Sequence, residues 1–236
     1  MSNSKIHRFY LGNISVQEVQ KFGEQRMWLQ DRELMHQWQN VLRLRVGENV
    51  GLFNDKSEYI YSIVEHKQGE IELEKVTEEK RRVPNKQLLL AWSMIKKDNN
   101  DLVLQKGTEL GVTHFVPLLA ERSEKTGFDE TRALRIVIEA AEQCGRGDIP
   151  IIEEMLSPEE CVGRFSDHYT LFVADREGAD AKQDNKKPSG VLIGPEGGWS
   201  EKELAYFKEQ NVAGLNLGDL TLRAETAAIV AVHALQ

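Results

Sequence analysis

One stretch, residues 191–200 (VLIGPEGGWS), constrains the fold of this chain more than any other part of it. It begins with an apolar run of β-forming residues and then breaks into a turn rich in glycine and proline. Ser200 and Glu203 have the spacing of a capping box, so we expect a helix to begin there. A strand that leads through a glycine-rich turn into a helix often binds a ligand, because glycine lets the backbone approach closely.

A second stretch, residues 215–228 (LNLGDLTLRAETAA), repeats this arrangement. We expect a short strand over 215–217, a turn at Gly218 and Asp219, and an alanine-rich helix that follows Arg223. Two such loops can form two sides of one small-molecule pocket, and they can equally be ordinary connections. The GPEGG segment matches neither the dinucleotide fingerprint nor the phosphate-loop motif, so the pattern supports neither NAD nor ATP.

Strands and helices alternate through the second half of the chain. The predicted strands are 88–93, 114–119, 169–174 and 191–193, and the predicted helices are 98–110 and 131–144. Alternation of this kind predicts an α/β domain in which helices cover a parallel sheet. Ligands bind to such sheets outside the carboxyl ends of the strands, where both loops lie. Residues 179–189 are polar, and we expect a mobile loop there.

The first part of the chain has the pattern of a small β-barrel. The predicted strands are 6–11, 41–47, 49–53, 58–65 and 70–76, with a helix over 33–41. Apolar and cationic residues alternate over 41–47, which places Arg43 and Arg45 on one face that is either a binding face or simply solvated. The charged stretch 77–82 has the composition of a linker. We therefore expect one domain over 1–76 and a second over 77–236.

Charge and cysteine content limit the partners and the compartment. The chain has 236 residues and a net charge of −8, which by itself disfavours nucleic acid as a partner. Arginines are nevertheless frequent near the amino-terminal end, and a local basic face is enough to bind RNA. Cys144 and Cys161 lack the spacing of metal ligands, which indicates reduced thiols and a cytoplasmic protein. Residues 1–5 lack the apolar core of a secretory signal, and we expect no membrane span.

Six segments along the chain resemble one known family. They are HRFYL at 7–11, VLRLRVGENV at 41–50, QKGTELGVTHFVPLLAERS at 105–123, EAAEQCGR at 139–146, IGPEGG at 193–198 and LGDLTLRAETA at 217–227. In this order they are similar to the ribosomal RNA small subunit methyltransferase E family of the SPOUT superfamily. Thr221 and Trp199 depart from the family pattern, in which we expect an aliphatic residue and a phenylalanine. Neither change removes a polar group that we assign to chemistry.

The resemblance implies a fold and a reaction. The fold is a PUA-like β-barrel for RNA over 1–76 and an α/β methyltransferase domain with a trefoil knot, a rare exception to the rule against threaded loops, over 77–236. The cofactor is S-adenosyl-L-methionine, no metal is involved, and the protein is a homodimer. The reaction is methylation of N3 of one uridine in 16S ribosomal RNA near the decoding region, with the assembled small subunit as the expected substrate.

The resemblance also implies roles for individual residues. The cofactor is expected on the two loops, largely through backbone amides and carbonyls, at Leu192, Ile193, Gly194, Pro195, Glu196, Gly197, Gly198, Leu217, Gly218, Leu220, Leu222, Arg223 and Thr226. Arg223 is the first candidate for stabilising the uridylate that forms when N3 loses its proton. Glu225 either orients Arg223, accepts that proton or caps the last helix. Glu196 either accepts a ribose hydroxyl or stabilises the helix that follows it.

Five arginines are candidates for contact with RNA. Arg8, Arg43 and Arg45 belong to the predicted barrel, and Arg122 and Arg146 are expected nearer the cofactor. His114 precedes a buried strand, and we interpret it as a structural histidine rather than a catalytic one.

Three alternatives remain open. A related SPOUT methyltransferase would modify a ribose 2′-hydroxyl or another base. A ribosome-assembly factor would bind the cofactor without transferring a methyl group, and the intact LRAETA motif argues against it. A nucleotide-binding α/β enzyme would need phosphate motifs that the chain lacks.

Overall fold

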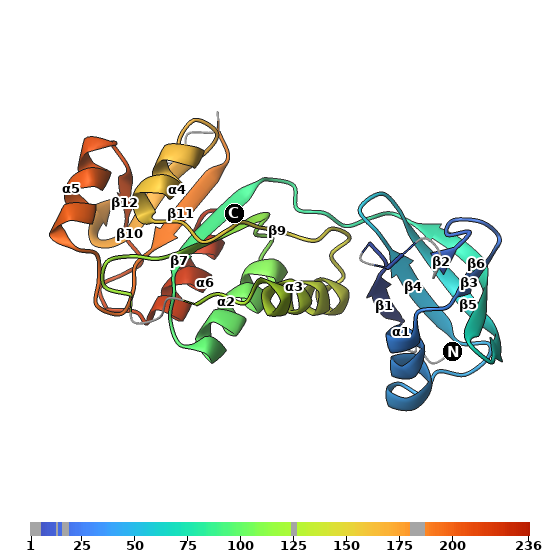
Figure 1. Ribbon diagram of the computed structural model, residues 1–236. Helices are drawn as coiled ribbons and strands as arrows, with labels where there is room; N and C mark the ends of the chain where they lie inside the picture. Colours follow the sequence, from blue (N-terminus) through green and yellow to red (C-terminus); the bar gives the residue numbers. More distant parts are fainter. Residues whose placement is uncertain (1–5, 13, 16–18, 124–126, 180–186) are drawn as a thin grey trace. The chain divides into compact units, whose positions relative to one another are not determined.

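The computed structural model describes residues 6–12, 14–15, 19–123, 127–179 and 187–236 (Figure 1). The chain divides into two compact units, each with its own core. Unit 1 consists of Met1–Val83 and Ala141–Asp148, and unit 2 consists of Pro84–Ala140 and Ile149–Gln236. The division therefore falls seven residues after the predicted boundary at 76, and unit 1 also contains a short segment from the middle of the chain.

Unit 1 contains a six-stranded mixed sheet. Its strands are β1 (His7–Tyr10), β2 (Val19–Gln20), β3 (Arg26–Leu29), β4 (Asn49–Phe53), β5 (Glu58–Lys67) and β6 (Glu70–Glu79), in the order β1-β4-β5-β6-β3-β2. β1 pairs with β4 in parallel, and the other neighbouring pairs are antiparallel. The predicted strand over 49–53 is confirmed. β6 extends to Glu79, so residues 77–79 belong to a strand and not to a linker as predicted.

Local chemistry explains the turns of this sheet, and apolar burial explains its core. The Asn54 side chain accepts hydrogen bonds from the backbone N–H groups of Lys56 and Ser57, both at 2.9 Å, and so closes the turn between β4 and β5. Gly69 has a φ of +86° in the turn between β5 and β6, a conformation that glycine adopts readily. Trp38 and Tyr61 are fully buried at the centre of the core.

The predicted strand over 41–47 is wrong. α1 (Arg32–His36) continues as the π-helix η1 (Gln37–Val41), and the chain then leaves the helix through Arg43, whose φ is +54°. The backbone N–H of Leu44 donates to the carbonyl of Trp38 at 2.9 Å, so this segment bonds back to its own helix instead of to a neighbouring strand. The alternation still separates two sides, because Leu42 and Leu44 pack on the core while Arg43 and Arg45 are exposed.

Unit 2 contains a six-stranded sheet in which every neighbouring pair is parallel. Its strands are β7 (Leu88–Ser93), β8 (His114–Leu118), β9 (Ile151–Ile152), β10 (Thr170–Ala179), β11 (Ser189–Ile193) and β12 (Ala213–Leu215), in the order β12-β10-β11-β7-β8-β9. The predicted α/β class and parallel sheet are confirmed. The strand predicted over 215–217 instead ends at Leu215, and most of the loop predicted over 179–189 lies outside the described residues.

Helices cover both faces of this sheet (Figure 1). They are α2 (Lys97–Glu109), α3 (Glu130–Cys144) and α6 (Ala224–Ala234) on one face, and α4 (Pro158–Phe165) and α5 (Glu201–Glu209) on the other. Successive strand residues alternate between the faces, so that Val191 and Ile193 pack in the α6 layer and Leu192 packs in the α4–α5 layer. The parallel arrangement brings the carboxyl ends of all six strands to one edge.

Candidate functional site

The two loops that follow β11 and β12 line one cavity of about 510 Å³ at the carboxyl ends of three parallel strands, β10, β11 and β12. Its lining consists of Ala174, Asp175, Ile193, Gly194, Pro195, Glu196, Gly198, Trp199, Leu204, Leu215, Leu217, Gly218, Leu220, Thr221, Leu222, Arg223, Ala224 and Ala227. The hypothesis that the two loops form one pocket is therefore confirmed by the geometry.

The first loop needs glycine because an aromatic ring occupies the space beside it. A Cβ added at Gly194 would lie 3.0 Å from Cε2 and 3.1 Å from Nε1 of the Trp199 indole. Trp199 is 8% exposed and packs edge-on against Phe207, with ring centroids 5.0 Å apart. Gly198 has a φ of +68°, and its N–H donates to the carbonyl of Pro195 at 2.8 Å, which closes a tight turn. The loop thus places a buried indole in the cavity wall.

A capping box sets the start of α5, as predicted. The Ser200 N–H donates to Glu203 Oε2 at 2.7 Å, and the Glu203 N–H donates to Ser200 Oγ at 3.3 Å. Glu203 is only 2% exposed, and its other oxygen, Oε1, accepts a hydrogen bond from the backbone N–H of Glu121 at 2.9 Å. Both oxygens of this buried carboxylate therefore accept hydrogen bonds from backbone N–H groups.

The second loop turns at Gly218, whose φ is +111°. The Gly218 N–H donates to Asn216 Oδ1 at 2.6 Å, a local side-chain bond typical of asparagine turns. Arg223 is the N-cap residue of α6, and its carbonyl accepts from the N–H of Ala227 at 2.8 Å. Its side chain is exposed, and within the described residues it forms no ion pair. The guanidinium group is therefore at the cavity wall and open to solvent.

Most of the predicted cofactor residues line this cavity, and three do not. Leu192 is fully buried in the α4–α5 layer, because strand alternation turns its side chain away from the cavity. Gly197 lies against Arg122, whose Cβ would be 3.4 Å from an added Cβ. Thr226 is exposed on α6. The prediction was one of contact largely through backbone amides and carbonyls, so the direction of a side chain does not decide it, and for these three residues it stays a prediction.

Sequence reasoning missed Asp175, which lines the cavity from β10. The charged side chains in the lining are those of Asp175, Glu196 and Arg223, so the cavity wall carries two acidic groups and one basic group. A carboxylate that follows the buried run 169–174 at the carboxyl end of a parallel strand was the available signal.

Glu225 is in the first turn of α6 and is 8% exposed. It does not line the cavity, whereas Arg223 does. A carboxylate in the first turn stabilises a helix through the positive end of its dipole. The structure therefore brings only one of the two predicted catalytic side chains to the cavity.

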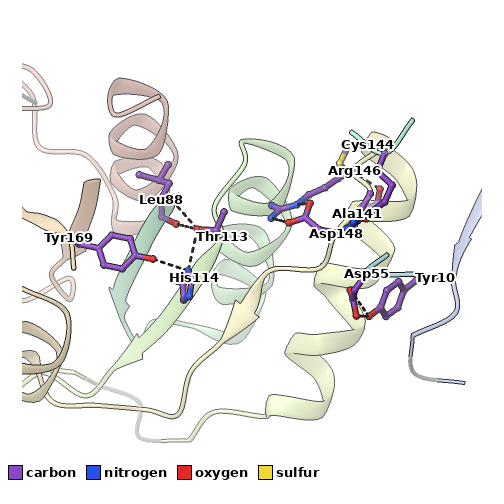
Figure 2. Close-up of polar contacts among 12 residues, drawn as sticks. Tyr10, Asp55, Leu88, Thr113, His114, Ala141, Cys144, Arg146, Asp148 and Tyr169 are labelled. Carbon is purple, nitrogen blue, oxygen red and sulfur yellow. Dashed lines mark hydrogen bonds and ion pairs between the residues drawn. The ribbon is translucent and has the colours of Figure 1, made fainter. Parts of the chain in front are cut away.

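The interpretation of His114 as a structural histidine agrees with its place at the amino end of β8, the edge opposite the cavity. Its Nδ1 is 3.0 Å from the Tyr169 hydroxyl and 3.2 Å from Thr113 Oγ1 (Figure 2). Burial lowers the pKa of its ring, and the Glu153 carboxylate opposes that shift.

Arg8 and Arg146, two of the candidates for contact with RNA, are engaged in ion pairs and hydrogen bonds inside unit 1. Arg8 forms an ion pair with Glu58 at 2.7 Å and donates to the carbonyls of Ala141 and Arg146 at 3.3 and 3.2 Å, all within unit 1. Arg146 is 5% exposed, and its guanidinium is held by Asp148 at 2.8 and 2.9 Å (Figure 2). Guanidinium groups buried in this way stabilise the unit and are not presented to a phosphate.

The other three arginines are exposed. Arg43 and Arg45 follow the π-helix of unit 1. Arg122, in unit 2, donates from Nη1 to the carbonyl oxygens of Gly197 at 3.2 Å and Trp199 at 3.1 Å. Of these candidates, Arg122 is the one that contacts the glycine-rich loop.

Neither a metal site nor a membrane-spanning helix is found among the described residues. No group of three or more His, Cys, Asp or Glu side chains among them is arranged to hold a metal ion. None of the helices in that part of the chain has the length and apolar character needed to cross a bilayer.

Comparison with known proteins gives the family. Residues 82–236 match the model of the RNA methyltransferase domain family. The chain is 31% identical over 225 residues to the ribosomal RNA small subunit methyltransferase E of Bacillus subtilis strain 168, covering 86% of this chain and 87% of that protein. The corresponding enzyme of Aquifex aeolicus strain VF5 is 31% identical over 198 residues, covering 80% and 85%.

A solved structure supports the same assignment over nearly the whole length. The ribosomal RNA small subunit methyltransferase E of Neisseria gonorrhoeae, bound to S-adenosyl methionine, is 30% identical with a TM-score of 0.83, covering 98% of this chain and 97% of that one. The cavity at the carboxyl ends of a parallel sheet, the family match and these relatives together identify the chain as a member of the ribosomal RNA small subunit methyltransferase E family of RNA methyltransferases.

Proposed function

We propose that this protein uses S-adenosyl-L-methionine to methylate N3 of one uridine in 16S ribosomal RNA near the decoding region. The observation that carries the proposal is the single cavity built by the two glycine-containing loops, in a chain whose relative from Neisseria gonorrhoeae is described as bound to that cofactor. The volume of about 510 Å³ falls within the range of about 300–1,000 Å³ that is usual for ligand pockets.

The lining of the cavity fits the chemistry of this cofactor. Leu217, Leu222 and Trp199 offer apolar and aromatic surface to an adenine ring, and the glycines leave backbone groups open to its edge. Asp175 and Glu196 suit the positive charges of the sulfonium and ammonium groups or the ribose hydroxyls. Arg223 is the basic group in the wall, and it suits an anion.

When bound, the cofactor supplies an electrophilic methyl group, so the protein has to orient the acceptor nitrogen and promote loss of its proton. Alignment of reacting groups contributes up to about 7–11 kcal/mol. Arg223 stabilises the negative charge that develops on the uracil oxygens, because its donors are fixed in a planar fork. Glu225 holds the first turn of α6, and so the position of Arg223 at its N-cap. Because N3 is on the Watson–Crick edge, the target uridine has to be unpaired when it enters.

We assign RNA binding to the sheet of unit 1, as a PUA-like barrel, and the trefoil knot of the superfamily to unit 2. Arg43 and Arg45 support the first assignment, since both are exposed and the backbone at Arg43 adopts an unusual positive φ. Substituting either arginine by alanine is expected to weaken RNA binding uniformly across sequences and to reduce the salt dependence, the slope of log K against log salt, by about 1. An unchanged slope in both variants would show that neither arginine contacts a phosphate of the RNA.

The proposed assembly is a homodimer that acts on the assembled small subunit in the cytoplasm. The dimer rests on the family resemblance, and Val230 of α6, which is 37% exposed, gives a position at which to test it. Sedimentation equilibrium of wild type and Val230→Glu tests it, and a wild type that remains monomeric at micromolar concentration would exclude it.

The proposed reaction is tested on small subunits from cells that lack the protein. These are incubated with the protein and radiolabelled S-adenosylmethionine, and the RNA is digested to nucleosides. Label in 3-methyluridine is the expected result. Label in another nucleoside would retain the cofactor but refute the substrate. Binding of the cofactor without any label would favour a ribosome-assembly factor.

A further inference from the structure

Two adjacent residues of the segment between β8 and α3 form hydrogen bonds, here called ties, to the glycine-rich loop and to α5, the helix that follows it. Arg122 donates from one guanidinium nitrogen, Nη1, to the carbonyl oxygens of Gly197 at 3.2 Å and Trp199 at 3.1 Å. The backbone N–H of Glu121 donates to Glu203 Oε1 at 2.9 Å, while Glu203 Oε2 accepts from Ser200 at 2.7 Å. Both ties are within unit 2, and neither Arg122 nor Glu203 lines the cavity.

The loop that receives the Arg122 bonds contains two adjacent glycines. Gly197 and Gly198 have no side chains to pack, and glycine loses the most backbone freedom when it becomes ordered. A peptide plane is rigid, so a bond to the Gly197 carbonyl also fixes the orientation of the Gly198 N–H. That N–H closes the turn onto Pro195 at 2.8 Å. Arg122 thus restrains the tight turn without lining the cavity.

Packing and burial strengthen both ties. The Arg122 Cβ would lie 3.4 Å from a Cβ added at Gly197, so its side chain rests against the turn. Glu203 is 2% exposed, and a hydrogen bond to a carboxylate is stronger in such a poorly solvated place. The arrangement resembles the support that surrounding residues give to a binding site, where they set the geometry without touching the ligand.

We propose that Arg122 and Glu203 are positioning residues, which hold the glycine-rich loop in the shape that binds the cofactor. This inference rests on the proposed function, because it takes the cavity to be the S-adenosylmethionine site. Loss of the Arg122 tie should weaken cofactor binding about tenfold, the ratio that corresponds to about 1.4 kcal/mol. The KM for S-adenosylmethionine should rise while kcat remains unchanged, because the residue does not touch the reacting atoms.

The test measures Kd for S-adenosylmethionine by titration calorimetry in Arg122→Ala, Arg122→Lys, Glu203→Gln and the double variant Arg122→Ala with Glu203→Gln. Lysine keeps a charged donor and should recover part of the affinity. The Glu203 carboxylate accepts from the backbone N–H groups of Ser200 and Glu121 through separate oxygens. A glutamine side chain has only one oxygen, so it cannot keep both hydrogen bonds in this arrangement. Since the two ties restrain the same loop, the double variant should lose less than the product of the two single losses.

The control is Arg164→Ala, which removes an exposed arginine of α4 that pairs with Glu154 at 2.8 Å and does not line the cavity. The melting temperature of Arg122→Ala should stay within about 2 °C of wild type, because the residue is exposed. An Arg122→Ala protein with the wild-type Kd overturns the inference, and so does a loss of affinity that Arg164→Ala reproduces. A wild-type protein that fails to bind the cofactor instead overturns the proposed function, and this inference with it.

Discussion

Replacing Gly194 by alanine tests how the first loop shapes the cavity. The backbone at Gly194 has no positive φ, so alanine is allowed by conformation, and only the neighbouring ring opposes it. The new methyl group would lie 3.0–3.1 Å from Cε2 and Nε1 of Trp199, which is closer than an ordinary contact. Trp199 is 8% exposed, packs against Phe207 and lines the cavity, so a displaced ring changes the cavity wall.

The expected cost follows from this overlap. Forcing one methyl group into a packed site destabilises a protein by about 1–3 kcal/mol, and each kcal/mol lowers the melting temperature of a chain of this size by about 2–4 °C. A displaced indole should also weaken S-adenosylmethionine binding. In a Trp199→Phe background the smaller ring leaves room, so the same Gly194→Ala change should cost less than half as much.

Thermal unfolding and calorimetric titration measure both effects in wild type, Gly194→Ala, Trp199→Phe and the double variant Gly194→Ala with Trp199→Phe. Gly163→Ala is the matched control, because Gly163 is in α4 and an added Cβ there would meet no atom within 4 Å. That change should stabilise the protein by about 0.5–1 kcal/mol, the usual gain of alanine over glycine in a helix. If Gly194→Ala keeps the melting temperature and Kd of wild type, the steric reasoning is refuted.

Three further outcomes are expected. Arg223→Ala should lower single-turnover methyl transfer at saturating cofactor about 10²–10³-fold, and a variant that keeps more than half the rate would exclude Arg223 from the chemistry. Asp175→Asn should weaken binding of S-adenosylmethionine more than that of S-adenosylhomocysteine, because only the former has a sulfonium charge; equal losses in paired titrations would contradict a charge role. The folded pKa of His114 is depressed below its ordinary 6.5, so its contribution to stability is complete above pH 6.5 and is lost as the pH falls through the lower folded pKa. Denaturant unfolding of His114→Asn should show a smaller loss of stability than wild type between pH 7 and 5, and an identical pH dependence would count against this origin.

The sequence alone was sufficient for the features that depend on near neighbours. The predicted strand over 88–93 agrees with β7 residue for residue, because six apolar or small residues in a row are typical of a strand buried on both faces. The capping box at Ser200 and Glu203 was also readable, since it depends on residues within four positions of one another. The common cavity followed from two strand–turn–helix segments in one parallel sheet.

Only the tertiary structure decided which side chains serve the cavity and which are used inside the protein. Arg8 meets Glu58 across fifty positions of sequence, and no local pattern distinguishes a buried arginine of this kind from an exposed one such as Arg43. Leu192 belongs to the glycine-rich motif but faces the opposite layer, whereas Asp175 belongs to no motif and lines the cavity. The physical reason is that periodicity and turn chemistry act over a few residues. The partner of a charge and the direction of a side chain are instead set by the pairing of strands that are distant in the sequence.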